Sequence, residues 1–151
     1  MDIDIAGAES RVELKSLLFD HVEYARDLDQ QYDGVLSSEF TIEIKGDEAI
    51  TPEDCEGERS VRVTLELFGN EDKDGPIYIA VRLVGVFYIS AASSDQFAHL
   101  LNYNTVAMMM PYIRSQITLL TSQPGLTPLI LPVVDVNKLV NSQAAANAKQ
   151  E

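Results

Sequence analysis

The sequence predicts an α+β protein of one domain, residues 1–151, in which an antiparallel sheet precedes helices. Apolar and polar residues alternate in several segments before residue 90, which is typical of half-buried strands. Beyond residue 90 the apolar residues recur every three or four positions, as on a helix. The connection GNEDKDGP has the Gly, Asn, Asp and Pro content of a hairpin, which favours antiparallel pairing.

The first segment, RVELKSLLFDHVEYARDLDQQ, leaves two interpretations open. Leu14, Leu18 and Val22 have the spacing of a helix. A bent strand is the other interpretation, and it uses three alternating pairs: Val12 with Leu14, Leu17 with Phe19, and Val22 with Tyr24.

Three segments carry the strand pattern. In SSEFTIEIKG, Phe40, Ile42 and Ile44 alternate with polar residues, and the same alternation returns in SVRVTLELF. PIYIAVRLVGVFYIS is expected to be a longer, more buried strand with Gly85 at a β-bulge. One face of the sheet should therefore be apolar and the other charged and wet.

A long helix is expected after the last strand. The segment SSDQFAHLLNY opens with Ser and Asp, which suit a helix N-terminus. Two apolar stripes follow on different sides of the helix: Val106, Met110, Ile113, Ile117 and Leu120 form the first, and Met108, Tyr112 and Leu119 the second. A helix with two apolar sides needs two partners, for which we expect the sheet and a second subunit. Pro111 should kink this helix or end its first segment.

An apolar segment, GLTPLILPVV at residues 125–134, follows the helix. Pro128 and Pro132 argue against a helix or a central strand, so we expect a loop. Its large apolar residues cannot all be buried, because irregular backbone in a core leaves N–H and C=O groups unpaired. Asp135 should cap a last helix, whose end at residues 141–151 has little to bury and should fray.

The charge is strongly asymmetric along the chain. The formal net charge is −13, from 24 acidic and 11 basic residues. Residues 1–74 hold 21 acids and 7 bases, a balance of −14, and residues 75–151 hold 3 acids and 4 bases, a balance of +1. Such a chain repels phosphate, so we expect neither nucleic-acid binding nor attachment to anionic membranes, and basic partners fit best.

The compartment is expected to be the cytoplasm. The single cysteine, Cys55, cannot form an internal disulfide, and MDIDIAGAES lacks the basic and apolar regions of an export signal. The longest apolar strand segment contains Arg82 and is too short to span a membrane, so no membrane insertion is expected.

The residues that usually carry catalysis are scarce. The chain has two histidines; His99 fits a packing role, and the acidic surroundings of Cys55 disfavour a reactive thiolate. The segment NEDKDGPI begins like a calcium loop, but Val81 stands where a bidentate glutamate is required. We therefore predict no enzyme, no cofactor and no metal site.

The methionines Met108, Met109 and Met110 have two interpretations: core filling, or a flexible surface that accepts many apolar partners. The apolar loop favours the second, because an exposed apolar groove on a soluble protein is ordinarily a binding site.

Two blocks of residues resemble the SecB family of export chaperones. AHLLNYNTVAMMMPYIRSQI and LTPLILPVVDVNKLV have, at the family's positions, Ala98, His99, Met110, Pro111, Tyr112 and Arg114, then Pro128, Leu129, Leu131, Pro132 and Leu139. GVFYIS is similar to the end of the family's last strand.

The resemblance implies a four-stranded antiparallel sheet packed on a long kinked helix and a short C-terminal helix, assembled as a dimer of dimers. It also implies an ATP-independent holdase that binds unfolded polypeptides in an apolar groove, with side chains in pockets and backbone pairing at a strand edge. The client groove would hold Phe40, Ile42, Ile44, Met108, Met109, Leu126, Leu129, Ile130, Leu131, Val133, Val134, Val136, Leu139 and Val140. The subunit interface would hold Val106, Met110, Ile113, Arg114, Ile117 and Leu120.

Partners beyond the client differ within the family. Exporting members carry an acidic residue on the fourth strand that helps to hold the SecA motor, and here Ala80 takes that place. Asp20 and Glu23 are candidates for the family's N-terminal acidic contact. Other relatives serve an antitoxin, so a chaperone dedicated to one client is the alternative function. An acidic mimic of nucleic acid is a further hypothesis, although the acids fall in loops and on alternating strand positions.

Overall fold

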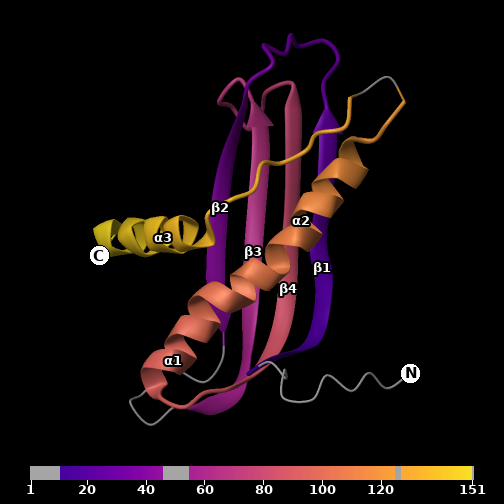
Figure 1. The fold of residues 1–151 in the computed structure, drawn as a ribbon. Helices are drawn as coiled ribbons and strands as arrows, with labels where there is room; N and C mark the ends of the chain where they lie inside the picture. The colour runs from indigo at the N-terminus through magenta and orange to yellow at the C-terminus, as the bar shows by residue number, and fades with distance from the viewer. Residues whose placement is uncertain (1–10, 46–54, 125–126, 151) are drawn as a thin grey trace, which may run out of the picture.

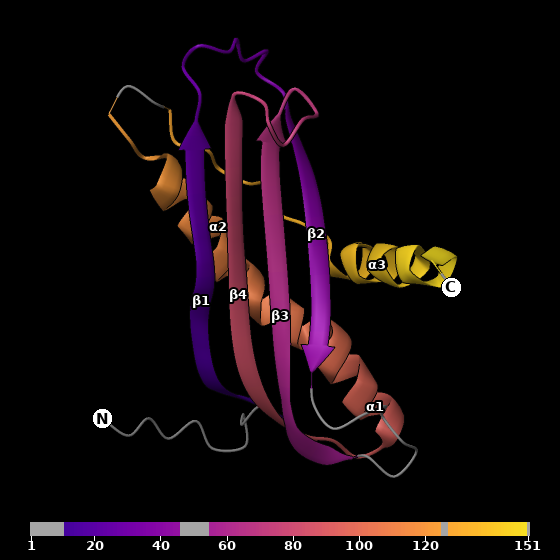
Figure 2. The same ribbon diagram turned by 180° about the vertical axis from the view of Figure 1, so that it is seen from behind.

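The computed structural model describes residues 11–45, 55–124 and 127–150. It contains a four-stranded antiparallel sheet with one face covered by a long helix (Figures 1 and 2). The strands are β1 (Val12–Arg26), β2 (Leu36–Lys45), β3 (Glu56–Gly69) and β4 (Ile77–Ser90), in the order β1-β4-β3-β2. The helices are α1 (Ser94–His99), the π-helical η1 (Leu100–Asn104), α2 (Thr105–Thr121) and α3 (Val136–Gln150). The predicted fold class is confirmed.

The first segment is a strand, so the bent-strand interpretation is correct. Its pairing with β4 shifts between Leu14 and Ser16 and again between Phe19 and His21, which leaves Lys15 and Asp20 as inserted residues. Each insertion moves the alternation by one position. The two insertions therefore explain why the sequence pattern changes phase along β1.

The bulge expected at Gly85 is not on β4. Gly85 pairs in regular register with Leu17 on β1 and Val61 on β3, and the irregularities lie on β1 instead. Glycine is required for a different reason: a Cβ at this position would lie 2.6 Å from Cε2 of the buried Phe87 ring. The aromatic ring occupies the space that a side chain would need.

The long helix runs without interruption from Ser94 to Thr121, 28 residues in all, and is kinked. Ser93 caps it, because its Oγ accepts a hydrogen bond from the Gln96 N–H at 3.2 Å. Pro111 lies inside α2 and removes one intrahelical hydrogen bond, but it does not end the helix. A second irregularity, the π-helical turn of η1, precedes α2.

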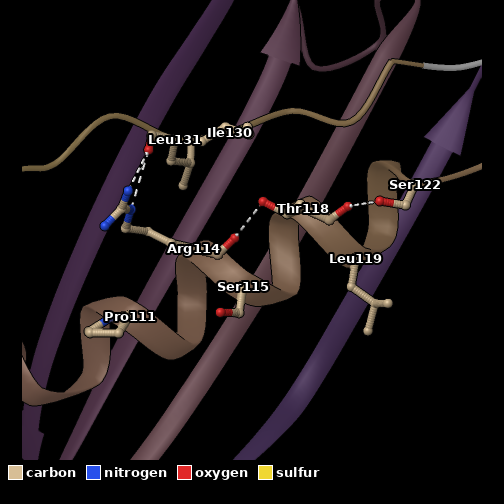
Figure 3. A pocket seen from close by; sticks show the side chains of 8 residues that line it. All are labelled: Pro111, Arg114, Ser115, Thr118, Leu119, Ser122, Ile130 and Leu131. Atoms are coloured by element: carbon tan, nitrogen blue, oxygen red, sulfur yellow. Dashed lines mark hydrogen bonds between the residues drawn. The ribbon is translucent and has the colours of Figure 1, made fainter.

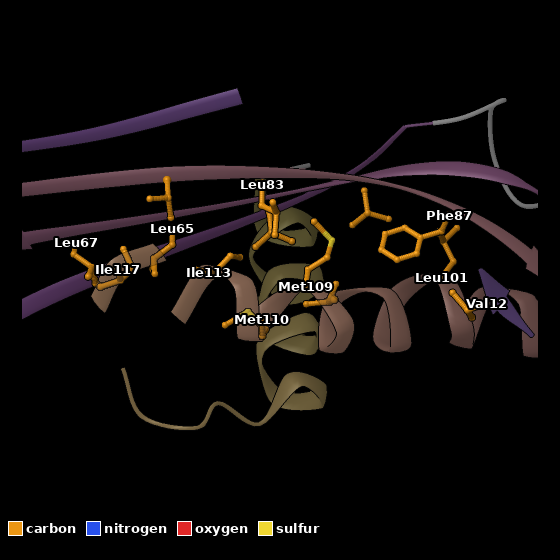
Figure 4. Close-up of a cluster of buried hydrophobic side chains, with 14 of the residues drawn as sticks. Val12, Leu65, Leu67, Leu83, Phe87, Leu101, Met109, Met110, Ile113 and Ile117 are labelled. Atoms are coloured by element: carbon orange, nitrogen blue, oxygen red, sulfur yellow. The ribbon is translucent and has the colours of Figure 1, made fainter. Parts of the chain in front are cut away.

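The core lies between the helix and the inner face of the sheet (Figure 4). Leu65, Leu83 and Phe87 from the sheet meet Met109 and Ile113 from the helix, and all are at most 1% exposed. Burial of this kind is the main stabilising term of the fold.

This packing corrects the predicted subunit interface. Val106, Met110, Ile113 and Ile117 are 0–5% exposed and pack in the core of their own chain, so their side chains offer no contact area to a second subunit. Of the two apolar stripes, the first faces the sheet. The second, with Met108, Tyr112 and Leu119, is 37–66% exposed.

The outer face of the sheet carries ion pairs, beside apolar residues such as Leu18, which is 54% exposed and pairs with Val84. Asp20, in the second bulge of β1, accepts a hydrogen bond from Arg82 Nε at 2.7 Å and lies 3.9 Å from Arg62, which also approaches Glu43 at 3.7 Å. The predicted division into an apolar inner face and a charged outer face is therefore correct.

Candidate functional site

An extended segment, residues 127–135, crosses the sheet between α2 and α3, and we call it the strap (Figure 1). Side chains of α2 fix its backbone. Leu129 N–H donates to Thr121 Oγ1 at 2.8 Å, and Leu129 C=O accepts from Thr118 Oγ1 at 2.9 Å. The guanidinium of Arg114 donates to the Leu131 carbonyl at 3.1 and 3.3 Å. Side chains of α2 thus form hydrogen bonds with backbone groups of the strap that have no partner in a sheet or helix.

The strap has some side chains turned toward the core and others turned toward water. Leu129, Leu131 and Val134 are partly buried against the core. Ile130 and Val133 are 74% and 83% exposed. The strap therefore keeps two large aliphatic side chains in water while its backbone stays fixed.

A cavity of about 550 Å³ lies between the strap and α2 (Figure 3). Its lining combines apolar and hydroxyl groups: Pro111, Arg114, Ser115, Thr118, Leu119, Ser122, Ile130 and Leu131. Arg114 is the one charged side chain in this lining and is held by the strap carbonyl. The cavity can therefore accept apolar groups together with hydrogen-bonding ones.

A second cavity, of about 240 Å³, lies beside the start of the strap. Tyr24, Arg26, Tyr32, Leu36, Ile77, Ile79, Thr121, Thr127 and Leu129 line it. The guanidinium of Arg26 lies over the Tyr32 ring at 5.8 Å. Leu131 lines the first cavity and Leu129 lines the second, so the strap separates the two cavities.

The last helix is anchored at its first turns. Asp135 caps it, because its carboxylate accepts from Lys138 N–H at 3.2 Å, which confirms the predicted cap. Tyr103, on the π-helical turn, donates to Asn141 Oδ1 at 2.8 Å. The backbone is helical through Gln150, including the part of 141–151 that was expected to fray.

The predicted groove residues fall into four groups. Eight are partly buried around the strap, β2 and α3: Phe40, Ile42, Leu129, Leu131, Val134, Val136, Leu139 and Val140. Ile44, Met108, Ile130 and Val133 are exposed. Met109 is fully buried in the core, so its assignment to a groove is wrong. Leu126 lies outside the described residues.

Two residues of the site were missed by sequence reasoning. Thr118 and Thr121 hold the strap, together with Arg114, which was assigned to a subunit interface. The spacing of these three residues, four and then three positions apart, places them on one side of α2. A polar stripe beside a proline-containing apolar loop was the signal that could have revealed them.

The candidates for a motor contact lie on the outer face. The hydrogen bond from Arg82 lowers the pKa of Asp20 from its ordinary value of 3.8. Glu23 pairs with His21 at 3.2 Å. Ala80 is 3% exposed and stands between Glu23 on β1 and Glu66 on β3. Although β4 has no acidic residue at position 80, the residues paired with Ala80 on both neighbouring strands are glutamates.

Within the described residues, His, Cys, Asp and Glu form no group of three or more that could hold a metal ion. The segment that begins like a calcium loop joins β3 to β4, two strands, where a calcium loop joins helices. No helix in the described parts of the chain is long and apolar enough to cross a membrane.

Comparison with known proteins gives the family. Residues 19–147 match the family model described as preprotein translocase subunit SecB. The fold is similar to that of the Mycobacterium tuberculosis SecB-like chaperone Rv1957, solved with a ChAD peptide from the HigA1 antitoxin, with a TM-score of 0.60 and 15% identity over 83% of this chain and 88% of that one. Uncharacterized protein MJ0357 of Methanocaldococcus jannaschii is 29% identical over 75 residues, and the chain spans about half of its length. From its matched family model and its fold, the chain belongs to the SecB family of chaperones, a family that is not enzymatic.

Proposed function

We propose that this protein is an ATP-independent holdase of the cytoplasm that binds unfolded or partly folded polypeptides along the strap and its two cavities. The observation that carries the proposal is the exposure of Ile130 and Val133, at 74% and 83%, on a backbone that α2 holds in place. Exposed aliphatic groups favour contact with other apolar groups over water. Because the strap is already ordered, binding costs it little conformational entropy.

The charge distribution supports an apolar client. Arg114 is the one charged residue among residues 105–134, whereas the acids described lie mainly on the outer face and in the loops. The carboxylate of Asp135 lies at the end of the strap, where it caps α3, so an unfolded segment can reach Ile130 and Val133 without placing its apolar side chains against other carboxylates.

The direct test is suppression of aggregation. A slowly folding client is diluted from denaturant with and without the protein, in the absence of ATP, and light scattering is recorded. We expect the wild type to suppress scattering at near-stoichiometric amounts, and the double variant Ile130→Ser with Val133→Ser to lose most of this effect while keeping its unfolding midpoint.

The matched control removes two exposed apolar side chains elsewhere. Leu28 and Val35, in the loop between β1 and β2, are 83% and 57% exposed. The double variant Leu28→Ser with Val35→Ser should suppress scattering as the wild type does. Equal losses in the two double variants, or no suppression by the wild type, would contradict the proposal.

A narrower function is a dedicated chaperone of one client such as an antitoxin. The similar Rv1957 fold was solved with an antitoxin peptide, and Ala80 stands where exporting members have an acid. Affinity capture followed by mass spectrometry separates the two functions. A general holdase retains many proteins, and a dedicated chaperone retains one.

Coupling to the SecA motor is the third question. Asp20 already accepts a hydrogen bond from Arg82, so a basic partner that binds Asp20 must compete with this interaction. Binding of SecA to the wild type and to Glu23→Gln decides the matter: loss of binding in the variant would support the acidic contact, and no binding to the wild type would favour the dedicated function.

We further propose that the chain forms a homo-oligomer, a dimer of dimers, in which the stripe with Met108, Tyr112 and Leu119 makes one of the two different contacts that such an assembly requires. This stripe is the exposed apolar side of α2. Leu119→Glu should lower the native mass by weakening this contact, and a monomeric wild type would contradict the proposal.

A further inference from the structure

The six arginines of the chain differ in what their guanidinium groups contact. Five of them form hydrogen bonds or ion pairs: Arg11, Arg59, Arg62, Arg82 and Arg114. Arg26 is different. Within the described parts of the chain its guanidinium has neither kind of contact, and it lies over the Tyr32 ring at 5.8 Å. In a chain with 24 acidic residues, this arginine keeps its hydrogen-bond donors available for a ligand.

Arg26 stands at the second cavity, the one of about 240 Å³ beside the start of the strap. The deep part of its lining includes Ile77, Ile79 and Thr121, which are at most 8% exposed, whereas Arg26 is exposed. Arg26 is also the one charged residue in this lining. The cavity therefore combines a mainly apolar interior with a positive charge at its mouth.

Two hydroxyl groups add to the donors of Arg26. Tyr24 and Tyr32 line the same cavity and are half-buried, and neither hydroxyl has a hydrogen-bond partner among the residues that the structure describes. A tyrosine O–H and a guanidinium N–H both donate, and a carboxylate accepts. Donors without partners around an apolar cavity favour a ligand that has an anionic group and an apolar one.

The loop between β1 and β2 holds Arg26 in place. Asp27 N–H donates to the Pro76 carbonyl at 2.9 Å, and Gln30 Nε2 donates to the Asp27 carboxylate at 2.8 Å and to the Asp74 carbonyl at 3.0 Å. The acid next to Arg26 is thus engaged within the loop. The loop, the connection from β3 to β4 and the end of α2 lie at the same end of the sheet (Figures 1 and 2). A site that is ordered in advance loses little conformational entropy when it binds.

The size of the cavity matches one amino-acid side chain. An apolar cavity of about 150 Å³ holds a benzene molecule. A volume of about 240 Å³ therefore accommodates a leucine or phenylalanine side chain with a small polar group beside it. In the last residue of a polypeptide the side chain and the carboxylate branch from the same Cα. A C-terminal apolar residue thus carries both an anionic and an apolar group within the reach of one cavity.

We propose that the second cavity binds the C-terminal residue of a client polypeptide, with its apolar side chain in the cavity and its carboxylate on the guanidinium of Arg26. This inference rests on the proposed holdase function and adds a preference to it. Leu129 belongs to the strap and also lines this cavity, so one client can occupy both. Internal client segments, which have no terminal carboxylate, bind the strap without help from Arg26.

The test is a double-mutant cycle between protein and peptide, measured by fluorescence anisotropy. The probe is a short fluorescent peptide of valine and serine that ends in leucine, made with a free C-terminal carboxylate or with a carboxamide. The wild type should bind the carboxylate form about tenfold more tightly, because charge-assisted hydrogen bonds are strong. Arg26→Gln should bind both forms equally, with the affinity of the wild type for the carboxamide.

Arg11→Gln is the matched control. It removes one positive charge next to the other end of β1, where Arg11 donates to Gln96 at 2.9 Å and is not part of the cavity lining. This variant should keep the preference for the carboxylate form, and urea denaturation should show that both variants are folded. Equal binding of the two peptide forms by the wild type, or a preference that survives in Arg26→Gln, would overturn the proposal.

Two further ligands test whether the C-terminal residue is recognised as a unit. A carboxylate peptide of the same composition, with serine last and leucine inside, should bind more weakly than the parent. The free acid isocaproate has the side chain and carboxylate of leucine; if it displaced the probe at the concentrations at which the unlabelled peptide does, the cavity would be a site for small amphiphilic acids and the proposal would be wrong. Suppression of client scattering is measured separately, so failure of these tests leaves the holdase proposal to its own assay.

Discussion

Gly85 has no side chain, and the space beside its backbone is filled by the ring of Phe87. The nearest ring atoms of Phe87 would lie 2.6 and 3.0 Å from a Cβ at Gly85, and Phe87 is fully buried. A ring enclosed on all sides cannot move away at low cost. The residue therefore acts through packing, although its place in a strand pattern suggested a bulge.

Gly85→Ala should lower the free energy of unfolding by about 1–3 kcal/mol, as overpacking of a core does. Urea denaturation measures the change. The double variant Gly85→Ala with Phe87→Leu provides the control, because a smaller side chain removes the clash and the two effects should not add. Full additivity would contradict the packing explanation.

The ion pairs of the outer face give a residue-level prediction of pH dependence. The hydrogen bond from Arg82 lowers the pKa of folded Asp20 below 3.8, the value expected in the unfolded chain. The folded state therefore binds this proton less tightly, and the stabilisation is complete above pH 3.8 and is lost as the pH falls toward the folded pKa. Asp20→Asn should cost less than about 1 kcal/mol at pH 7, because the pair is partly exposed.

Denaturation of wild type and Asp20→Asn at several pH values tests this. The difference in stability should shrink below pH 3.8. A difference that is constant from neutral to acidic pH would show that Asp20 acts through packing and not through its charge.

At the scale of elements, the strap and α3 depend on α2 and on the π-helical turn. Thr121 is 7% exposed and both donates to Ile117 C=O and accepts from Leu129 N–H. Thr118 and Arg114 hold the next residues of the strap. The strap, which belongs to no helix or sheet, is thus held in position by three side chains of α2.

Thr121→Val keeps the shape of the side chain but removes the acceptor for the Leu129 N–H. Leaving a buried donor unpaired costs about 1–3 kcal/mol, so the urea midpoint should fall clearly. Ser115→Ala, an exposed hydroxyl on the same helix, should change stability by less than about 0.5 kcal/mol. Equal midpoints for the two variants would exclude the role given to Thr121.

Tyr103→Phe removes the hydrogen bond to Asn141 and should loosen α3 without unfolding the core. We expect faster amide exchange in α3 with an urea midpoint close to that of the wild type, because local opening is separable from global unfolding. Tyr112→Phe changes an exposed tyrosine of α2 and should leave exchange in α3 unaltered.

At the scale of the whole molecule, the ion pairs of the sheet lie on the side opposite to α2 and the strap (Figure 1). The outer face of the sheet carries ion pairs such as Asp20–Arg82, whereas the side with α2 and the strap carries the exposed side chains of Ile130 and Val133. If clients bind at the strap as proposed, their binding to this chain of net charge −13 should depend little on charge.

Binding of a neutral apolar peptide should change by less than about twofold between about 0.05 and 0.5 M NaCl, since salt screens charges and not apolar contacts. Fluorescence anisotropy measures the affinity. If the protein instead acted as an acidic mimic of nucleic acid, a basic partner would bind its outer face and should lose affinity steeply over the same salt range. A steep loss of affinity for the neutral peptide would contradict the assignment of the strap side as the client site.

The sequence predicted β2, β3, β4, a helix N-terminus among the Ser and Asp residues of SSDQFAHLLNY, and the cap at Asp135, because these depend on local alternation and local hydrogen bonds. It left β1 open, since two insertions break the alternation there. It assigned the first stripe of α2 to a subunit interface, because periodicity separates two sides of a helix but does not say which one meets the sheet. The hydrogen bond between Thr121 and the strap was missed because it depends on how the strap folds back on α2, and the polar stripe on α2 was its only trace in the sequence.

The strap is attached through its main-chain amide and carbonyl groups, which every residue type possesses. Attachment of this kind does not restrict what stands at residues 130 and 133, so substitutions there are free to accumulate without disturbing the scaffold. Under the proposed holdase function, exchange of these two outward side chains should change which client segments are preferred, and a library randomised at both positions should yield folded proteins with altered client preference.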